Sequence, residues 1–436
     1  MHDTPQYDVA IVGASLAGCA AARLYAQQGL SVALVEQHAD VDWHKRLCTH
    51  YIQACAVPTV RRLGLEPLLE RAGAVRSRME IWTRWGWIRH GGPTAPETYG
   101  YSMRRQVIDP ILRRLAVETP GVEMLLGWTA TGLIREGRMI RGVTLRDRNG
   151  ATRQVTARLV VAADGRNSPL ATMAEIPVKR TTNGRFIYFA YYRNLRLASG
   201  DDSRFWMLDP DAAYALVNDN GVTLVACWPT KDRLPAFRED RERAFAEFIG
   251  RLPDGPDLAS AERVGDMLGA IDLPIELRGG ACGGIALAGD AALSIDPLWG
   301  VGCGWALQSA EWLVDSTAET LRTCGNIESA LARYYRRHRH MLAGHYTTIA
   351  DYASGRRFRW LEKLVFSTAP RDTVVANRVL DFGARRIGVL RLFSPSTFVR
   401  AVTSRLRPAR ANSLHDDRAT SSRSADVRDT AAALRP

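Results

Sequence analysis

Two glycine-rich segments, far apart in the chain, carry residue types suited to holding a dinucleotide. The first is Gly13-Ala14-Ser15-Leu16-Ala17-Gly18, which follows an apolar run and opens an alanine-rich stretch. Gly13 permits a tight turn, Gly18 lets a helix pack on a strand, and the N–H groups at the helix N-terminus then face a pyrophosphate. We predict a nucleotide site that includes Ser15, Leu16 and Ala17, with Ser15 in place of the usual middle glycine. A tight turn in another α/β fold is the alternative for this motif alone.

An acidic residue closes the apolar run that follows. Glu36, followed by Gln37, stands where a carboxylate accepts hydrogen bonds from an adenosine ribose. Because an acid at this position disfavours a 2′-phosphate, the tightly held nucleotide is expected to be FAD or NAD and not NADP. A surface glutamate at the end of a strand is the alternative.

The second segment begins at Gly289-Asp290-Ala291-Ala292, passes Asp296-Pro297 and ends in a glycine turn. Asp290 is suited to accept hydrogen bonds from a ribityl chain. The predicted cofactor residues of the turn are Gly300, Val301, Gly302 and Cys303, beside Gly289. A helix beginning here would stabilise negative charge on a reduced flavin. Cys303 is interpreted first as a small residue in a crowded turn; the alternative is a thiol whose pKa the same helix terminus lowers.

The elements that must position these motifs follow from apolar periodicity. Buried strands are expected over 7–12, 31–35, 155–162 and 285–288, and helices over 16–28, 61–72, 105–118 and 305–321. A pair of strands is expected over 122–148, and single strands over 79–89, 186–197, 205–208, 213–218 and 222–228. Further helices are expected over 238–252, 327–353, 358–366, 374–386 and 389–406. The predicted fold class is α/β: an FAD-binding, three-layer, Rossmann-like domain with an inserted antiparallel β-sheet substrate domain and a helical C-terminal cap.

The chain is expected to cross between these domains several times. Residues 1–78, 105–175 and 279–325 are assigned to the FAD-binding domain, and residues 79–104 and 176–278 to the substrate domain. Residues 326–407 form a basic helical region. Residues 408–436 lack any apolar period and are predicted to be a disordered tail.

With Val160-Val161-Ala162-Ala163-Asp164-Gly165 between them, these motifs resemble, in order and separation, those of FAD-dependent enzymes of the p-hydroxybenzoate hydroxylase group. That group includes aromatic hydroxylases, geranylgeranyl-reductase-like enzymes and halogenases. The resemblance, over roughly 7–321, implies FAD as cofactor, NADPH or NADH as electron donor, and FAD contacts by Arg46, Arg105 and Asp164. Leu293 stands where many hydroxylases have histidine, and the glycine turn is closer to the reductase and halogenase branches. The run from Trp85 to Arg89 is similar to a halogenase signature but precedes the Asp-Gly motif, so we interpret it as an aromatic strand.

We therefore expect an FAD-dependent monooxygenase that uses NAD(P)H and O₂ on a small apolar or aromatic molecule. A reductase of isoprenoid-like double bonds is the alternative, a halogenase comes third, and a non-catalytic FAD-binding adaptor is the competing class. No catalytic base is identified. His50 is a candidate for proton transfer because imidazole titrates near neutrality, with a structural histidine as the alternative. Trp299 is a candidate for an aromatic wall beside the flavin.

The net charge of +12 is concentrated near the C-terminus, where Arg333 to Arg407 holds 16 Lys or Arg and 4 Asp or Glu. A solvated basic face is the first interpretation. The alternative is weak contact with an anionic membrane through the apolar residues Leu361, Leu364, Val365 and Phe366. Nucleic-acid binding is not expected, since no recognition motif accompanies the charge.

The seven cysteines predict neither a disulfide framework nor a metal site, since their number is odd and no C-x-x-C pair occurs. The N-terminus has no basic region of a signal peptide, and no apolar run approaches the ~20 residues of a membrane span. We expect a cytoplasmic protein, with peripheral membrane contact as the open alternative.

Overall fold

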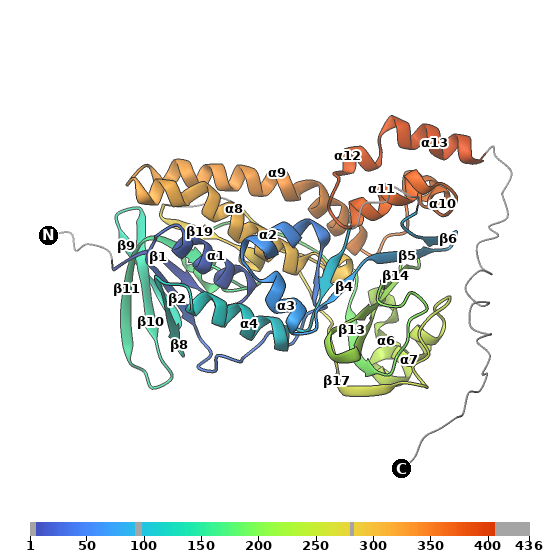
Figure 1. The fold of residues 1–436 in the computed structure, drawn as a ribbon, viewed down its shortest axis with the longest axis horizontal. Coiled ribbons are helices and arrows are strands. Elements are labelled where there is room, and N and C mark those ends of the chain that lie inside the picture. The colour runs from blue at the N-terminus through green and yellow to red at the C-terminus, as the bar shows by residue number, and fades with distance from the viewer. Residues whose placement is uncertain (1–5, 92–97, 280–282, 406–436) are drawn as a thin grey trace, which may run out of the picture.

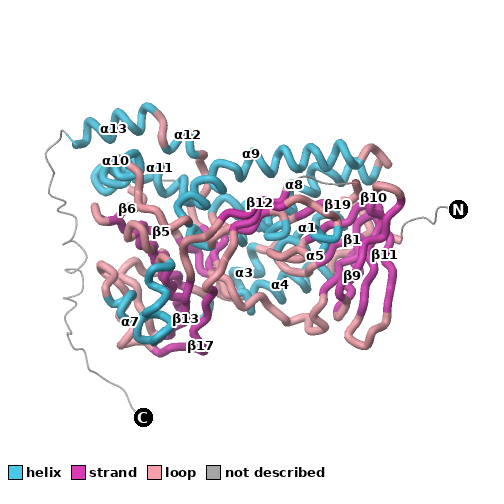
Figure 2. The backbone as a smooth tube through the Cα atoms, turned by 180° about the vertical axis from the view of Figure 1, so that it is seen from behind, coloured by secondary structure: helices cyan, strands magenta, loops and turns pink. Residues whose placement is uncertain are grey.

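The computed structural model describes residues 6–91, 98–279 and 283–405. The predictions for the tail at 408–436 and for Cys282 lie outside these residues. Two sheets at opposite ends of the molecule are connected by long helices, and α9 (Ile327–Ala353) runs along the upper edge toward the C-terminal helices (Figures 1 and 2).

The first sheet has a parallel core around β1 (Tyr7–Val12), whose last four residues are buried. β1 pairs with β2 (Val32–Glu36) and β11 (Thr152–Ala162), while β8 (Val122–Leu126) and β19 (Ile285–Leu287) extend the sheet on either side. The near-continuous Val, Ile, Leu and Ala content of these strands suits a sheet covered on both faces. Because parallel strands end at one edge, the turns after β1, β2, β11 and β19 lie near one another.

The region 122–148 differs from the expected strand pair. β8 joins the parallel core, while β9 (Thr129–Glu136) and β10 (Met139–Arg146) form an antiparallel extension on the first half of β11. The region 122–148 therefore forms three strands and not two. The strand β11 is long enough to pair with β10 through its first half and with β1 through its second half.

Helices cover one face of this sheet. α1 (Leu16–Gln27) packs against α4 (Arg105–Val117) and α8 (Gly302–Arg322), and its alanines are buried. Small side chains let the helices approach closely, which brings the N-termini of α1 and α8 to the same edge of the sheet. The order of helices, parallel sheet and antiparallel layer is the predicted three-layer α/β fold.

The second sheet contains seven strands. Its order is β17 (Glu262–Ala270), β13 (Ile187–Arg193), β16 (Val222–Trp228), β15 (Ala212–Val217), β14 (Ser203–Met207), β5 (Met79–Thr83) and β6 (Gly86–Ile88). Neighbours are antiparallel except β14 and β5. Asn220 and Gly221 take positive φ in the turn before β16, as the Asn-Gly pair predicts. The strand expected over 79–89 is a hairpin of β5 and β6.

Helices near the C-terminus cover the second sheet. These are α10 (Trp360–Thr368), α11 (Thr373–Gly383), α12 (Val389–Leu392) and α13 (Pro395–Arg405). Phe358, Val365 and Phe366 share a buried cluster with Ile81 and Phe205 of the sheet. The helix expected over 389–406 divides at Ser394-Pro395, because proline cannot continue a helix from the preceding turn. Among the helices of the described residues, none combines the length and apolarity that crossing a membrane requires.

The remaining elements are short. The predicted helix at 61–72 is divided at Gly64 into α2 (Val57–Arg62) and α3 (Glu66–Arg71), and that at 238–252 is α6 (Leu234–Glu239) followed by α7 (Arg241–Gly250). Two small sheets comprise β3 (Tyr51–Ile52), β7 (Gly100–Ser102) and β4 (Val75–Ser77), and β12 (Val178–Thr181), β18 (Ile275–Arg278) and β20 (Leu293–Ser294). α5 is Pro169–Met173, and single 3₁₀ turns include Ala54–Ala56, Lys231–Arg233, Gly289–Ala291, Pro297–Trp299 and Ala369–Arg371.

Candidate functional site

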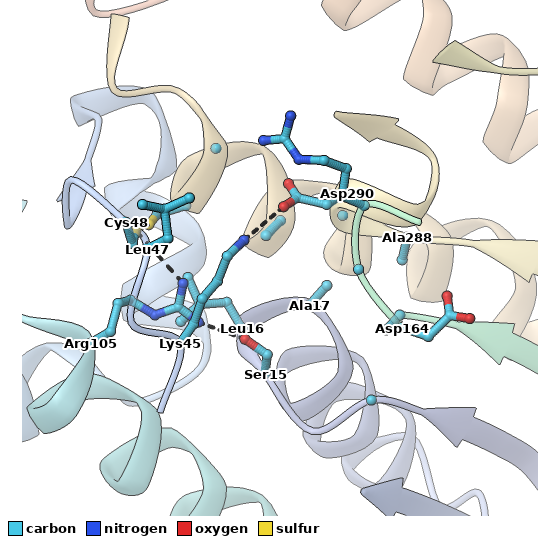
Figure 3. Close-up of a pocket in the computed structure, with 18 of the residues that line it drawn as sticks. Ser15, Leu16, Ala17, Lys45, Leu47, Cys48, Arg105, Asp164, Ala288 and Asp290 are labelled. Atoms are coloured by element: carbon cyan, nitrogen blue, oxygen red, sulfur yellow. Dashed lines mark hydrogen bonds and ion pairs between the residues drawn. The ribbon is translucent and has the colours of Figure 1, made fainter. Parts of the chain in front are cut away.

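Both glycine-rich segments open onto one cavity of about 430 Å³. Figure 3 shows Ser15, Leu16 and Ala17 on one wall, and Asp290 and Ala288 across from them. The cavity extends from the end of the parallel sheet to β13 of the second sheet, where Ile187 and Phe189 line it. Segments 270 residues and more apart in sequence therefore form one site.

The first glycine turn cannot accept larger residues. Gly13 has φ +102°, and a Cβ there would lie 2.3 Å from the carbonyl oxygen of Ala163. A Cβ on Gly18 would lie 1.8 Å from the carbonyl oxygen of Gly13. Gly13 lines the cavity, whereas Gly18 lies behind it in the contact between helix and strand. The turn thus holds the first N–H groups of α1 against the cavity, where a phosphate would meet them.

Glu36 lies at the carboxyl end of β2 and lines the same cavity beside Gln37. Its side chain is 5% exposed. Oε2 accepts a hydrogen bond from the Ala14 N–H at 2.9 Å, and Oε1 accepts one from the His38 N–H at 3.0 Å. Two backbone bonds fix the carboxylate, and each oxygen retains a second lone pair for a hydroxyl of the ligand.

Arg105 places a buried positive charge beside the first turn of α1. Its Nη2 donates to Ser15 Oγ at 2.6 Å and its Nε donates to Asp109 Oδ1 at 2.7 Å. Burial lowers the pKa of Arg105, but Asp109 and Cys48 raise it by more, so the guanidinium stays charged. The serine that replaces the middle glycine of the motif therefore accepts a hydrogen bond from this arginine, and both residues line the cavity at the first turn of α1 (Figure 3).

Lys45, and not Arg46, extends into the cavity. Lys45 Nζ pairs with Asp290 Oδ2 at 2.9 Å, whereas Arg46 is exposed and absent from the cavity wall (Figure 3). Successive side chains of an extended segment point to opposite sides, so a shift of one residue separates the two. The structure thus places Lys45 in the cavity wall where the sequence pointed to Arg46. The sequence shows a basic pair here but not which of its two members faces the cavity.

Asp290 lies in the turn after β19. Burial raises the pKa of its carboxyl, but Lys45 and Arg166 lower it by more, so the carboxyl is held as the anion. The preceding Gly289 has φ +60°, and a Cβ there would lie 2.9 Å from the Ala17 Cβ. The two motifs therefore touch at Gly289 and Ala17, and Asp290 projects from this contact into the cavity.

Asp164 also lines the cavity, but its carboxylate is engaged by its own turn. Oδ1 accepts from Ser168 Oγ at 2.6 Å and Oδ2 from the Leu170 N–H at 3.0 Å. Burial raises the pKa of this carboxyl, against the effect of both hydrogen bonds. The side chain points away from Lys45 and Asp290 in Figure 3, so its described partners give it a structural role at the start of α5.

The second glycine turn presents Gly300, Gly302 and Cys303 to the cavity, while Val301 is buried behind them. Gly300 has φ +61°, and a Cβ there would lie 3.3 Å from Tyr51. A Cβ on Gly302 meets no atom within 4 Å, so this position faces open space. The N-terminus of α8 is therefore exposed to a ring bound in the cavity.

Cys48 and Cys303 lie side by side, with 3.6 Å between their sulfur atoms. The hydrogen bond from Cys303 lowers the pKa of the Cys48 thiol, aided by His50 and Arg105, although burial opposes it. Cys48 and burial raise the pKa of Cys303. The pKa of Cys303 is thus raised and not lowered, while that of Cys48 is lowered, which leaves Cys303 with the interpretation of a small residue in a crowded turn. All six cysteines in the described ranges are free thiols.

His50 is buried and does not belong to the cavity wall. Its Nδ1 accepts from the Arg105 N–H at 3.1 Å, and its Nε2 is bonded to the Tyr191 hydroxyl. With Nδ1 as acceptor, the neutral ring carries its proton on Nε2. Both nitrogens are engaged within the protein, so this geometry supports the structural alternative for His50.

Trp299 faces a second, smaller cavity of about 40 Å³ and not the main one. Its ring packs edge-on against Phe205 and Phe382, with centroids 6.1 and 5.8 Å away. The expected aromatic wall is therefore supplied by other residues, because the turn from Pro297 to Gly300 directs Trp299 toward the C-terminal helices. The apolar end of the main cavity is lined by Leu47, Tyr51, Ile187, Phe189, Leu273, Ile295 and Pro297.

These residues fit an FAD. One end of the cavity offers backbone N–H groups, Arg105 and Glu36 to the nucleotide half of FAD. The middle of the cavity offers Asp290 to the ribityl chain. The other end combines the N-terminus of α8 with apolar walls, which suit the flavin ring. Gly302 leaves backbone open to the cavity, where a larger side chain would occupy the space of a ligand. In the parts of the chain that the structure describes, no cluster of three or more His, Cys, Asp or Glu is arranged to hold a metal.

Comparison with known proteins agrees with this geometry. Residues 6–237 match the model of a family described as FAD binding domain. The chain is 28% identical over 343 residues to digeranylgeranylglycerophospholipid reductase 1 of Methanopyrus kandleri, covering 76% of this chain and 85% of that protein. The flavin-dependent brominase Bmp2 has a similar structure, with a TM-score of 0.73 at 19% identity over 92% of this chain and 98% of that one. For the p-nitrophenol 4-monooxygenase PnpA of Pseudomonas putida the TM-score is 0.72, at 17% identity over 88% and 98%. At these identities the two structures show likeness of fold.

Proposed function

The chain belongs to the FAD binding domain family and is an FAD-dependent oxidoreductase, and from this premise we propose that it is a monooxygenase. The proposed substrate is a small apolar or aromatic molecule, and the proposed co-reactants are O₂ and NADPH or NADH. One oxygen atom enters the substrate and the other leaves as water, with two electrons and a proton from the nicotinamide and one further proton from solvent.

The observation that carries this proposal is the division of the main cavity. Charged and polar residues hold the nucleotide end, whereas the end beside the α8 N-terminus is walled by Tyr51, Ile187 and Phe189. An apolar chamber next to the reacting ring admits an apolar substrate and excludes water, which would otherwise compete for reactive species.

The chain's own residues orient and stabilise what binds. Bound FAD supplies the transfer of electrons and the activation of oxygen. The N–H groups at Gly302 and Cys303 present the positive end of a helix of 21 residues to any negative charge that develops nearby. Lys45 and Arg105 add two fixed cations to the same wall.

The test uses purified holoprotein, ¹⁸O₂ and a panel of apolar aromatic compounds. We expect NAD(P)H oxidation that depends on one class of compound, and a product heavier by one ¹⁸O atom. Anaerobic mixing with NADH and then with NADPH identifies the donor through bleaching of the flavin absorbance. Turnover that incorporates no oxygen from O₂ would contradict the monooxygenase proposal.

A reductase of isoprenoid-like double bonds is the second candidate, and a specific observation favours it. Cys48 and Cys303 place a thiol pair in the cavity wall, and saturating a carbon–carbon double bond requires a proton as well as a hydride. Several relatives at 23–28% identity are named as reductases of a digeranylgeranylglycerophospholipid. Under this candidate, anaerobic turnover yields a product richer by two hydrogens, and Cys48→Ser slows it strongly. Under the monooxygenase proposal, Cys48→Ser leaves oxygen transfer within a few-fold of normal.

A further inference from the structure

Exposed apolar side chains are concentrated on the C-terminal helices. Nine large apolar residues of the described chain are exposed, and seven of them lie between Met341 and Val402. Leu390 is 90% exposed and Trp360 is 71% exposed. Helices α10 to α13, which carry most of them, lie together at one end of the molecule (Figure 1). Single exposed apolar residues need no explanation, but such a concentration marks an interaction surface.

Helix α13 has a second apolar face that covers nothing in the described structure. Thr397 and Ala401 are fully buried on the side that packs against α10 and α11. Phe398, Val399 and Val402 are 44%, 58% and 42% exposed. At about 100° per residue Val399 lies opposite Thr397 and Ala401, Val402 lies next to Val399, and Phe398 lies between the two sides. The helix is therefore apolar on two sides, of which one faces outward.

Unpaired cations accompany these residues. Lys363 follows Trp360 on α10, Arg371 precedes α11, and Arg391 is adjacent to Leu390. All three are exposed, and none has an ion-pair partner among the described residues. Other basic residues here, such as Arg356 and Arg400, are paired with acids. The local field is positive, because the segment from Arg356 to Arg405, which contains these helices, has 11 basic and 3 acidic residues.

We propose that Trp360, Leu390, Phe398, Val399 and Val402, with Lys363, Arg371 and Arg391, dock the protein on an anionic lipid bilayer. Apolar side chains enter the boundary between headgroups and acyl chains while lysine and arginine meet anionic headgroups. The stripe expected from sequence is corrected: Leu364, Val365 and Phe366 are buried, the last two in the cluster shared with the second sheet. The outward-facing residues are Trp360 on the same helix and those of α12 and α13.

The positive charge of this surface favours a lipid bilayer over two other possible occupants, a second copy of the chain and the chain's own segment 408–436. A second copy would bring two strongly positive surfaces together, which repel. The segment 408–436 contains only three large apolar residues, Leu414, Val427 and Leu434, with which to cover the surface. An anionic bilayer satisfies both the apolar and the basic side chains.

The test measures flotation of the full-length holoprotein with vesicles of phosphatidylcholine, alone or with about 30% phosphatidylglycerol. We expect binding to the anionic vesicles that is lost when salt rises from 0.1 to 1 M, because the screening length falls from about 10 to about 3 Å. Lys363→Ala and Arg391→Ala each weaken binding about fivefold. The double variant Phe398→Ser/Val402→Ser weakens it roughly tenfold or more.

Matched controls are Val117→Ser on α4 and Arg148→Ala in the β10–β11 turn, both exposed and both outside this surface. Each control is expected to bind as the unmodified protein does. Equal binding to neutral and anionic vesicles overturns the proposal. A stable dimer that Phe398→Ser/Val402→Ser dissociates also overturns the proposal, because a second copy then covers the surface. Vesicle binding that is absent from the full chain and appears only after removal of residues 408–436 overturns it as well, because that segment then covers the surface. No arm requires turnover, so failure here is distinct from failure of the proposed reaction.

Discussion

Replacing Glu36 tests the nucleotide end of the site most directly. In Glu36→Ala the ribose hydroxyls lose a charged acceptor, and hydrogen bonds to charged groups contribute about 1.5–3 kcal/mol. FAD affinity is therefore expected to fall by roughly 10- to 150-fold. Glu36→Gln keeps an oxygen acceptor without the charge and should lose about half of that free energy.

The same substitution has a separate effect on folding. The Ala14 and His38 N–H groups donate to the carboxylate at 2.9 and 3.0 Å, and both lose their acceptor in Glu36→Ala. An unsatisfied buried donor costs about 1–3 kcal/mol. This cost is present with and without FAD, so it lowers the free energy of unfolding of the apoprotein without entering the binding constant.

The two effects are separated by two measurements. Quenching of flavin fluorescence during titration of the apoprotein gives the FAD dissociation constant, and urea denaturation of the apoprotein gives its unfolding free energy. Glu123→Ala on the neighbouring strand β8 is the control, since Glu123 is absent from the cavity wall. A folded Glu36→Ala protein that binds FAD within twofold of the unmodified protein would refute the assignment of Glu36 to the ribose.

Three further substitutions have expected outcomes. Lys45→Met removes the cation that lowers the Asp290 pKa, so FAD binding weakens, and on acidification the remaining FAD affinity is lost at a higher pH than in the unmodified protein. Arg46→Met is expected to change neither the FAD affinity nor its pH dependence. Titration of FAD affinity against pH measures both effects. Gly302→Val places a side chain in open cavity space, so FAD content falls while the apoprotein melts as before; a large drop in apoprotein melting temperature would contradict this. Burial lowers the pKa of His338 to about 4 in the folded protein, whereas in the unfolded chain the pKa is about 6.5. As pH falls below about 6.5 the unfolded chain therefore binds a proton at His338 before the folded protein does, and the free energy of unfolding decreases. Between pH 6.5 and 5 the contribution of His338 to this loss is about 1.6 kcal/mol, and urea denaturation should show that contribution missing in His338→Gln.

Local patterns in the sequence were sufficient for the core of the fold. The buried strand at 7–12, the alanine-rich helix after it and the long helix at 327–353 all occur as predicted. Their signals are short-range: apolar periodicity, a glycine turn and a helix boundary each extend over a few residues. The FAD prediction followed for the same reason, since a strand, a glycine turn and a helix define the phosphate site within a single βαβ unit.

Side-chain direction was decided by tertiary packing. Lys45 and Arg46 are chemically similar neighbours, and only the register of an extended segment against the cavity separates them. His50 and Trp299 appeared suited to the active site by type, yet one is clamped between Arg105 and Tyr191 and the other turns toward Phe382.

Contacts between distant segments were likewise beyond the sequence. Cys48 and Cys303 meet because α8 returns to the edge of the sheet. Their mutual hydrogen bond raises the pKa of Cys303, which is the direction opposite to the effect of a helix N-terminus. At the C-terminus, amphipathic periodicity located the helices but not which apolar residues face outward. A periodic pattern shows that a helix has an apolar face, whereas the elements that pack against it determine whether that face is buried, and this is settled by the arrangement of the whole chain.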